Sequence, residues 1–142
     1  RDRFSIEIET LPLPTADDFR VALASDEVVR IQRQIESRLQ QETANANKEL
    51  WNRLRYAVDN MVLRLSNPEG RFHDTLVNNL QQVVELVPKL NFTGNQDLQK
   101  VSDACSAALA VHSPQTLRDD TALRAKVAAQ AKEISNIMDA YM

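Results

Sequence analysis

The sequence predicts an all-α fold: a helical bundle of about five helices, one of them long, preceded by a single β-strand. Three observations support this prediction. The 142 residues include two glycines, where average usage would give about ten, so the chain has few tight turns. Apolar residues recur every three or four positions through most of the chain, which is the spacing of one helix face. A period of two, typical of a half-buried strand, occurs over residues 4–10 alone.

The predicted strand carries its apolar side chains, those of Phe4, Ile6 and Ile8, on one face, and the proline-rich segment Leu11–Pro14 closes it. A lone strand cannot satisfy its own backbone hydrogen bonds. We therefore expect its partner in missing upstream sequence, in another chain or in a short irregular segment of this one.

We divide the chain into two parts on this basis. Residues 1–14 are a strand and proline-rich lead-in that ends an absent upstream region, and residues 15–142 are one helical domain. The first residue, Arg1, is consistent with a chain that continues upstream. At the start of the helical domain, Thr15 opens a short helix through Ala24 with a capping-box pattern.

A second start signal at Ser25 precedes an apolar stripe that predicts one long helix, ending at the breaker cluster Ser66–Gly70. The stripe takes ten steps over 37 residues, or 3.7 residues per step, which is close to a straight α-helix. It consists of Val28, Ile31, Ile35, Leu39, Thr43, Ala46, Leu50, Leu54, Val58, Met61 and Leu65. Such a helix would be about 60 Å long, whereas a compact chain of this size is about 37 Å across. We expect either a break near Thr43–Asn47 or, as the favoured alternative, a continuous or slightly bent helix that packs on a partner.

Three more helices and one short turn complete the predicted bundle. A helix carrying Phe72 ends near Pro88, and a fourth helix continues its apolar stripe through Cys105, Ala108 and His112. Then Ser113 caps a short turn, with proline at its first helical position. The last helix is capped by Asp119 or Asp120 and has the stripe Leu123, Val127, Ala131, Ile134, Met138 and Tyr141.

Few residues could carry chemistry. Gly70 and Gly94 stand alone, which excludes the glycine-rich loops that hold nucleotides. Cys105 is the one cysteine, which excludes intrachain disulfides and multi-cysteine metal sites. We therefore predict that the protein is not an enzyme and has no catalytic residue, no metal, no cofactor and no small-molecule ligand. The least favoured alternative is a small hydrolase built on His73, with Glu69 orienting the imidazole.

The favoured function is a non-catalytic helical module for protein–protein interaction or self-association, with an oligomer as the expected state. The unpaired strand, the overlong helix and the lack of a credible site lead to this prediction. Trp51, the one tryptophan, lies beside the stripe and belongs to a residue type that is enriched at interfaces. The candidate interface residues are Phe4, Ile6, Ile8, Ile35, Leu39, Leu50, Trp51 and Leu54.

The alternative function is a nucleic-acid-associated accessory protein that binds through arginines of the long helix. Residues 26–71 contain eight basic and seven acidic side chains, a net charge of +1, whereas the whole chain carries −3. The candidate residues are Arg53, Arg55, Arg64 and Arg71, of which the first three lie near Trp51 and Tyr56 in the sequence. Because arginine stems commonly cover apolar helix surface while their charges stay in water, nucleic-acid binding is possible but not favoured.

Several segments resemble a family of uncharacterised proteins from tailed phages and prophages. These segments are Leu13–Arg20, Leu50–Leu54, Phe72–Val77, Leu86–Asn91, Leu117–Asp120 and Met138–Met142. The resemblance implies a phage or mobile-element origin, with this region as the C-terminal part of a longer protein, and it implies no activity. A cysteine-poor chain with no stretch of about 18 apolar residues and no leader predicts no membrane association and a cytoplasmic location, the host-cell cytoplasm if the chain is phage-encoded.

Overall fold

The computed structural model describes residues 25–141, so the predicted strand over 4–10, the predicted helix from Thr15 and the predicted boundary after residue 14 lie outside the described residues. The chain divides into two compact units, Arg1–Gln40 and Gln41–Met142. The described part of the first unit is helical throughout. The second unit contains the hydrophobic core.

The long helix predicted from the apolar stripe is confirmed as α1, Ser25–Leu65. Its first turn contains Asp26 and Glu27 and its last turn contains Arg64, charges that complement the helix dipole at both ends. Residues 43–47, where a break was the alternative, remain helical.

The next helix, α2, covers Thr75–Leu90 and begins later than the sequence predicts. Phe72 lies in the preceding loop, where it is buried. Pro88 sits in the last turn, and the helix continues past it to Leu90. A proline this close to the end of a helix removes one hydrogen bond without displacing a following helical segment, so it is tolerated there.

The predicted fourth helix is an α-helix, α3, Gln96–Cys105, followed directly by a π-helical turn, η2, Ser106–Ala110. Asn95 caps α3 by accepting hydrogen bonds from the backbone nitrogens of Asp97 and Leu98, both at 3.1 Å. A π turn holds more residues than an α turn, so the buried stripe shifts by one residue. Leu109 is fully buried, whereas Ala108, which the sequence places on the stripe, is half-buried.

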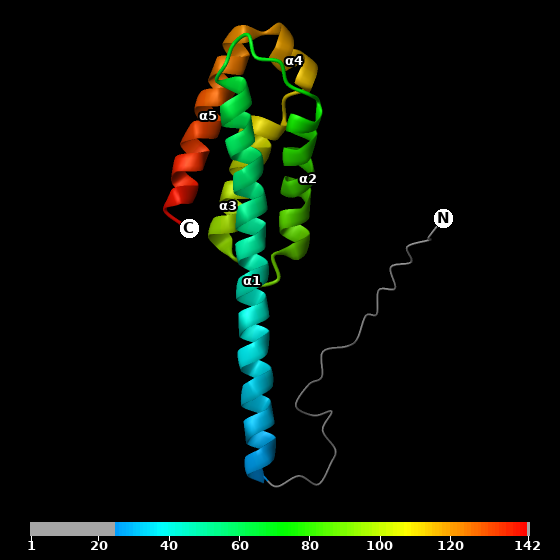
Figure 1. Cartoon of the computed structure of the whole chain (residues 1–142), viewed down its shortest axis with the longest axis vertical. Coiled ribbons are helices and arrows are strands. Elements are labelled where there is room, and N and C mark those ends of the chain that lie inside the picture. Colours follow the sequence, from blue (N-terminus) through cyan, green and yellow to red (C-terminus); the bar gives the residue numbers. More distant parts are fainter. Residues whose placement is uncertain (1–24, 142) are drawn as a thin grey trace, which may run out of the picture. The chain divides into compact units, whose positions relative to one another are not determined.

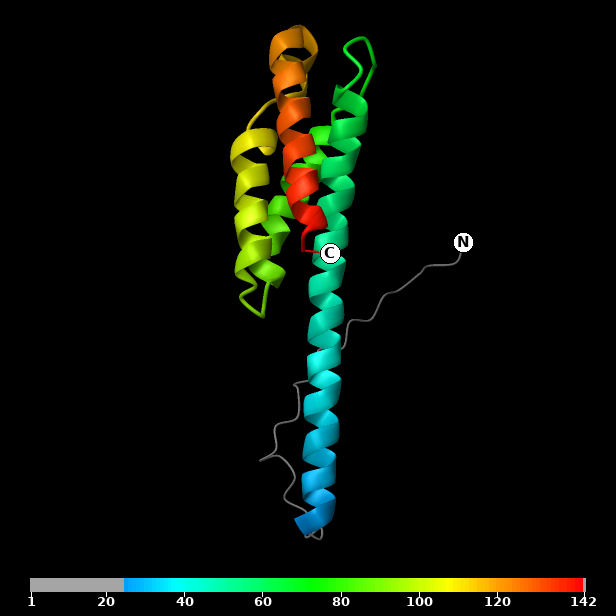
Figure 2. The ribbon, with the colours of Figure 1, turned by 90° about the vertical axis from the view of Figure 1, so that its left-hand side faces the viewer.

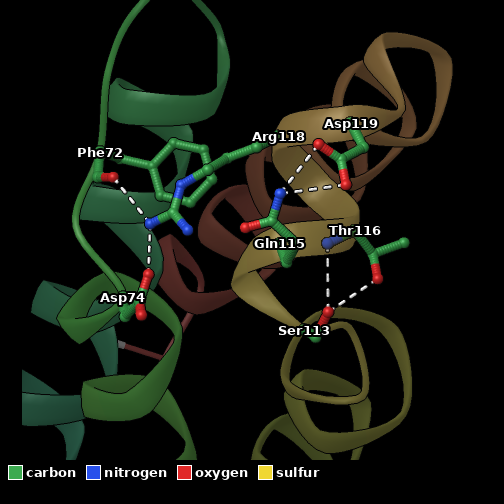
Figure 3. Close-up of polar contacts among 7 residues, drawn as sticks. All are labelled: Phe72, Asp74, Ser113, Gln115, Thr116, Arg118 and Asp119. Carbon is green, nitrogen blue, oxygen red and sulfur yellow. Dashed lines mark hydrogen bonds and ion pairs between the residues drawn. The ribbon is translucent and has the colours of Figure 1, made fainter.

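Two capped helices end the chain, α4, Pro114–Asp119, and α5, Thr121–Asp139. Ser113 Oγ accepts a hydrogen bond from the Thr116 backbone nitrogen at 3.1 Å, as Figure 3 shows. The Asp120 carboxylate accepts one from the Leu123 backbone nitrogen at 2.9 Å. The predicted cap at Ser113 is therefore confirmed, and of the two predicted candidates for the last helix, Asp119 and Asp120, the cap is Asp120.

Within the second unit, the C-terminal part of α1 lies beside α2 and α5, and α3 packs against α2 and α5 on the far side of the bundle from α1 (Figures 1 and 2). The chain alternates in direction from each of these four helices to the next (Figures 1 and 2). The loop from α1 to α2 lies at the same end as α4 (Figure 1). The core between the helices contains the large, fully buried side chains of Leu54, Met61, Leu65, Leu80, Leu98, Leu109, Leu117 and Met138. Residues 25–141 thus form five α-helices and no strand, which confirms the all-α bundle for that part of the chain.

Candidate functional site

The predicted interface residues separate into three groups. Phe4, Ile6 and Ile8 lie outside the described residues. Leu50, Trp51 and Leu54 belong to the chain's own core, with exposed fractions of 4%, 7% and 0%. Ile35 is half-buried and Leu39 is 48% exposed. Of this set, then, Ile35 and Leu39 present apolar surface in the described part of the chain.

Trp51 makes an aromatic contact with a residue that follows α5. Its ring stacks on that of Tyr141, with 5.6 Å between the ring centroids and 19° between the planes. The sequence favoured an interface role for this tryptophan. The structure instead gives it an intramolecular partner that is 90 residues away along the chain.

The first unit offers a different surface. Between residues 25 and 40 no side chain is buried. Val28, Ile31 and Ile35 are half-buried, and Leu39 is 48% exposed. These residues repeat at helical spacing on α1, so this part of the helix carries an accessible apolar stripe.

A groove of about 570 Å³ lies between α1 and α2 in the second unit. The α1 residues lining it recur at intervals of three and four, and so do those of α2, which places one face of each helix on the groove. The loop between the two helices contributes Arg71, Phe72 and His73 to the lining. The lining consists of Arg53, Tyr56, Ala57, Asn60, Arg64, Arg71, Phe72, His73, Thr75, Leu76, Asn79, Gln82 and Val83.

Three of the four predicted nucleic-acid residues, Arg53, Arg64 and Arg71, line this groove. Arg55 does not. It pairs with Asp139 of α5 and, at 3.3 Å, with Asp59. The hydrogen bond to Asp139 raises the pKa of Arg55 above its ordinary value.

The groove is locally positive although the whole chain carries a net charge of −3. None of its described lining residues is acidic. Arg53 Nε lies 2.8 Å from Glu49 Oε1 in an exposed pair, a kind of pair that contributes little to stability. Within residues 25–141, the guanidinium groups of Arg64 and Arg71 have no hydrogen-bond or ion-pair partner.

Arg124 of α5 fixes the loop that carries Arg71. Its guanidinium, 5% exposed, donates to the backbone oxygens of Arg64 at 2.9 Å, Asn67 at 2.6 Å and Gly70 at 2.6 Å. One side chain thus bonds the last turn of α1 and two points of the loop after it. The loop leaves α1 in a defined direction, which places Arg71 at the groove.

Arg118 of α4 holds the second half of the same loop (Figure 3). It donates to the Phe72 backbone oxygen at 3.1 Å and to the Asp74 carboxylate. The Phe72 ring lies 5.0 Å from the guanidinium carbon of Arg118 and 5.1 Å from that of Arg124, distances at which cations attract an aromatic ring. These contacts draw Phe72 out of α2, which explains the late start of that helix.

Sequence reasoning missed both supporting arginines. Arg124 lies three residues before Val127 and four before Ala128, two buried positions of α5, and this spacing was the available signal. The signal for Arg118 was weaker, because a six-residue helix has no apolar period long enough to define a buried face.

The residues considered for catalysis do not form a site. Glu69 and His73 were predicted to share a helix face, but they lie in the loop before α2, and His73 is exposed. The Cys105 thiol is fully buried, and burial raises its pKa to about 12. Among residues 25–141, no group of three or more histidine, cysteine, aspartate or glutamate side chains could hold a metal ion.

No described helix is long and apolar enough to cross a membrane. No protein-family model, no curated protein and no solved structure matches this chain.

Proposed function

We propose that the protein is a non-catalytic helical module that associates with a second copy of itself through the apolar stripe of α1 between Val28 and Leu39. The observation that carries the proposal is the accessibility of this stripe: none of its side chains is buried, and Leu39 is 48% exposed. Burying a valine, leucine or isoleucine side chain contributes about 1.5–3 kcal/mol, so covering several on each of two copies supplies a driving force for association.

The charge pattern of the same segment favours a second copy as the partner. Residues 25–40 contain three acidic and three basic side chains, so two copies brought together carry no net charge that would oppose association. The acidic side chains are those of Asp26, Glu27 and Glu36, and the basic ones are those of Arg30, Arg33 and Arg38. Glu27, Glu36 and Arg38 lie beside the stripe, and the other three charges lie on the opposite face of the helix. Opposite charges beside an apolar stripe are the pattern that selects partner helices in coiled coils. The phage origin suggested by sequence resemblance stays a prediction.

Sedimentation of the full chain over a range of concentrations tests the proposal. We expect wild-type protein to sediment as an oligomer, and the double variant Ile31→Glu, Ile35→Glu to sediment as a monomer, because two carboxylates in the stripe would have to be buried unpaired.

The matched control is Ser37→Glu with Gln40→Glu. It adds the same charge at exposed positions off the stripe, since Ser37 lies about 200° around the helix from Ile35 and Gln40 lies about 100° from Leu39. The control should keep the oligomer. A wild-type chain that stays monomeric at the highest concentration reached contradicts self-association.

A further inference from the structure

We infer that the groove between α1 and α2 binds the phosphates of a nucleotide ligand, with Arg64 and Arg71 as the anion contacts and Tyr56 as the surface on which a base stacks. This inference is independent of the proposed self-association, because every residue it uses lies in the second unit and outside the stripe Val28–Leu39.

The charge of the lining points to an anion. Arg53, Arg64 and Arg71 face a groove to which no described carboxylate contributes. Arg64 and Arg71 are exposed and have no partner among residues 25–141, so their donors are available. A guanidinium presents donors in a planar fork that matches the oxygens of a phosphate group.

The other lining residues point to a nucleotide rather than to a simple anion. Tyr56 is 72% exposed at the groove, and an exposed aromatic ring beside a basic groove is the arrangement on which unpaired bases stack. Asn60, Asn79 and Gln82 supply amide groups, which both donate and accept hydrogen bonds, as the edges of bases require.

The anion contacts at one end of the groove are held in position before any ligand binds. Arg71 belongs to the loop that Arg124 and Arg118 tie to α5 and α4 through four backbone carbonyl oxygens. Arg64 lies in the last turn of α1, whose backbone oxygen is one of those four. A ligand therefore meets two guanidinium groups on an already ordered backbone, which lowers the entropic cost of binding.

The length of the groove distinguishes two possible ligands, a free mononucleotide and a single strand of nucleic acid. Arg53 and Arg64 are 11 residues apart on α1, a rise of about 16 Å along the helix axis. A mononucleotide with its phosphates at Arg64 and its base on Tyr56 places no phosphate at Arg53, whereas a single strand of nucleic acid carries phosphates along the whole groove. Arg53→Ala should weaken binding of a strand and leave binding of a mononucleotide unchanged.

Fluorescence anisotropy of the full chain with three probes tests the inference: a labelled single-stranded RNA or DNA of about eight nucleotides, labelled ATP, and labelled inorganic polyphosphate. With three arginines on the strand, wild-type affinity should fall roughly twentyfold between about 50 and 200 mM salt. The double variant Arg64→Ala, Arg71→Ala should bind more weakly, and its affinity should fall only about threefold over that range.

Tyr56→Ala supplies a second, charge-neutral test. It should weaken binding of the oligonucleotide or ATP about fivefold or more, and leave polyphosphate binding unchanged, because polyphosphate has no base to stack. The control Lys100→Ala with Lys126→Ala removes two exposed positive charges that do not line the groove, and it should retain wild-type affinity. Circular dichroism verifies that each variant is folded.

Each outcome decides the inference. Binding of the oligonucleotide alone, or of ATP with similar affinity, supports it and identifies the source as a single strand or a free nucleotide. Absence of binding to both overturns it. An equal loss in the lysine control shows a non-specific charge effect and also overturns it. If polyphosphate binds and Tyr56→Ala affects none of the probes, the groove binds anions without recognising a base. That result overturns the nucleotide assignment.

Discussion

At the scale of single residues, Arg124 links the end of one helix to the loop that follows it. The last carbonyl groups of any helix lack intrahelical partners, and the Arg64 oxygen of α1 receives its hydrogen bond from this guanidinium, as do two loop oxygens. A buried charge is costly unless it is paired and hydrogen-bonded. Here three backbone oxygens accept hydrogen bonds from Nη2 and the Phe72 ring lies against the guanidinium, whereas Nε has no hydrogen-bond partner among residues 25–141.

Replacing Arg124 with Leu should therefore destabilise the fold by about 3 kcal/mol, because charged hydrogen bonds to three oxygens are lost together. Arg124→Lys should recover part of that loss, since the three oxygens accept from one atom, Nη2, and an ammonium also has donors for them, but the lysine side chain is one bond shorter and has no planar group to lie over the ring. Urea denaturation measures both values. The control is Arg118→Ala, a more exposed arginine on the same loop, which should cost about 1 kcal/mol. Equal costs for the two arginines would contradict the role assigned to Arg124.

Cys105 should be inert to alkylation in the native protein. Burial raises the pKa of its thiol from 9.0 to about 12, because a thiolate in the core would lose its solvation. Iodoacetamide at about pH 8.5, where an unfolded thiol is substantially ionised, should label the chain in urea and not in buffer, as read by mass spectrometry. Rapid labelling of the native chain would contradict this.

The same pKa shift makes stability depend on pH in one direction. Because the folded-state pKa is raised, the contribution of the thiol is fully present below the unfolded-state value and is lost as pH rises from about 9 towards 12. The difference in unfolding free energy between wild type and Cys105→Ala should therefore shrink over this range. A difference independent of pH would contradict burial of a protonated thiol.

At the scale of elements, local signals predicted the helix ends that depend on local chemistry. Ser113 and Asp120 each accept a hydrogen bond from a backbone nitrogen three residues later. The helix that starts at Ser25 has its acidic residues in its own first turn. The start of α2 was predicted too early, because Phe72 is drawn into contacts with α4 and α5. The π turn η2 was not predicted, because its effect is to place Leu109 in a core that only the packed helices define.

The docking of the end of α5 on α1 gives a prediction with an optical signal. Trp51 is the one tryptophan, and its ring stacks on Tyr141. Tyr141→Ala should shift the fluorescence maximum of the native protein to longer wavelength, because removing the stacked ring lets water reach the indole, and should cost about 1 kcal/mol. Tyr56→Ala, which alters the other tyrosine, should leave the spectrum unchanged. An unshifted spectrum in Tyr141→Ala would contradict this contact.

At the scale of the whole molecule, the two units present different kinds of surface. The helix of the first unit carries an accessible apolar stripe with balanced charges, on which the proposed self-association depends. The second unit buries its apolar stripes in one core and presents a groove lined by arginines on a chain that is acidic as a whole. Composition alone predicted neither surface, because a net charge of −3 for the whole chain does not indicate that one groove is lined by arginines.

The sequence alone predicted the all-α class, the extent of the long helix and most helix ends. It did so through the period of the apolar residues and the capping side chains, because helix formation and helix ends depend on residues a few positions apart. Tertiary packing decided which members of a predicted set share a site. Arg53 and Arg55 are two residues apart in the sequence, and a helix turns by about 200° between them, so one lines the groove and the other pairs with Asp139 of α5. Arg71 joins the groove because Arg118 and Arg124, distant in sequence, hold its loop. Trp51 is buried because Tyr141 returns to cover it.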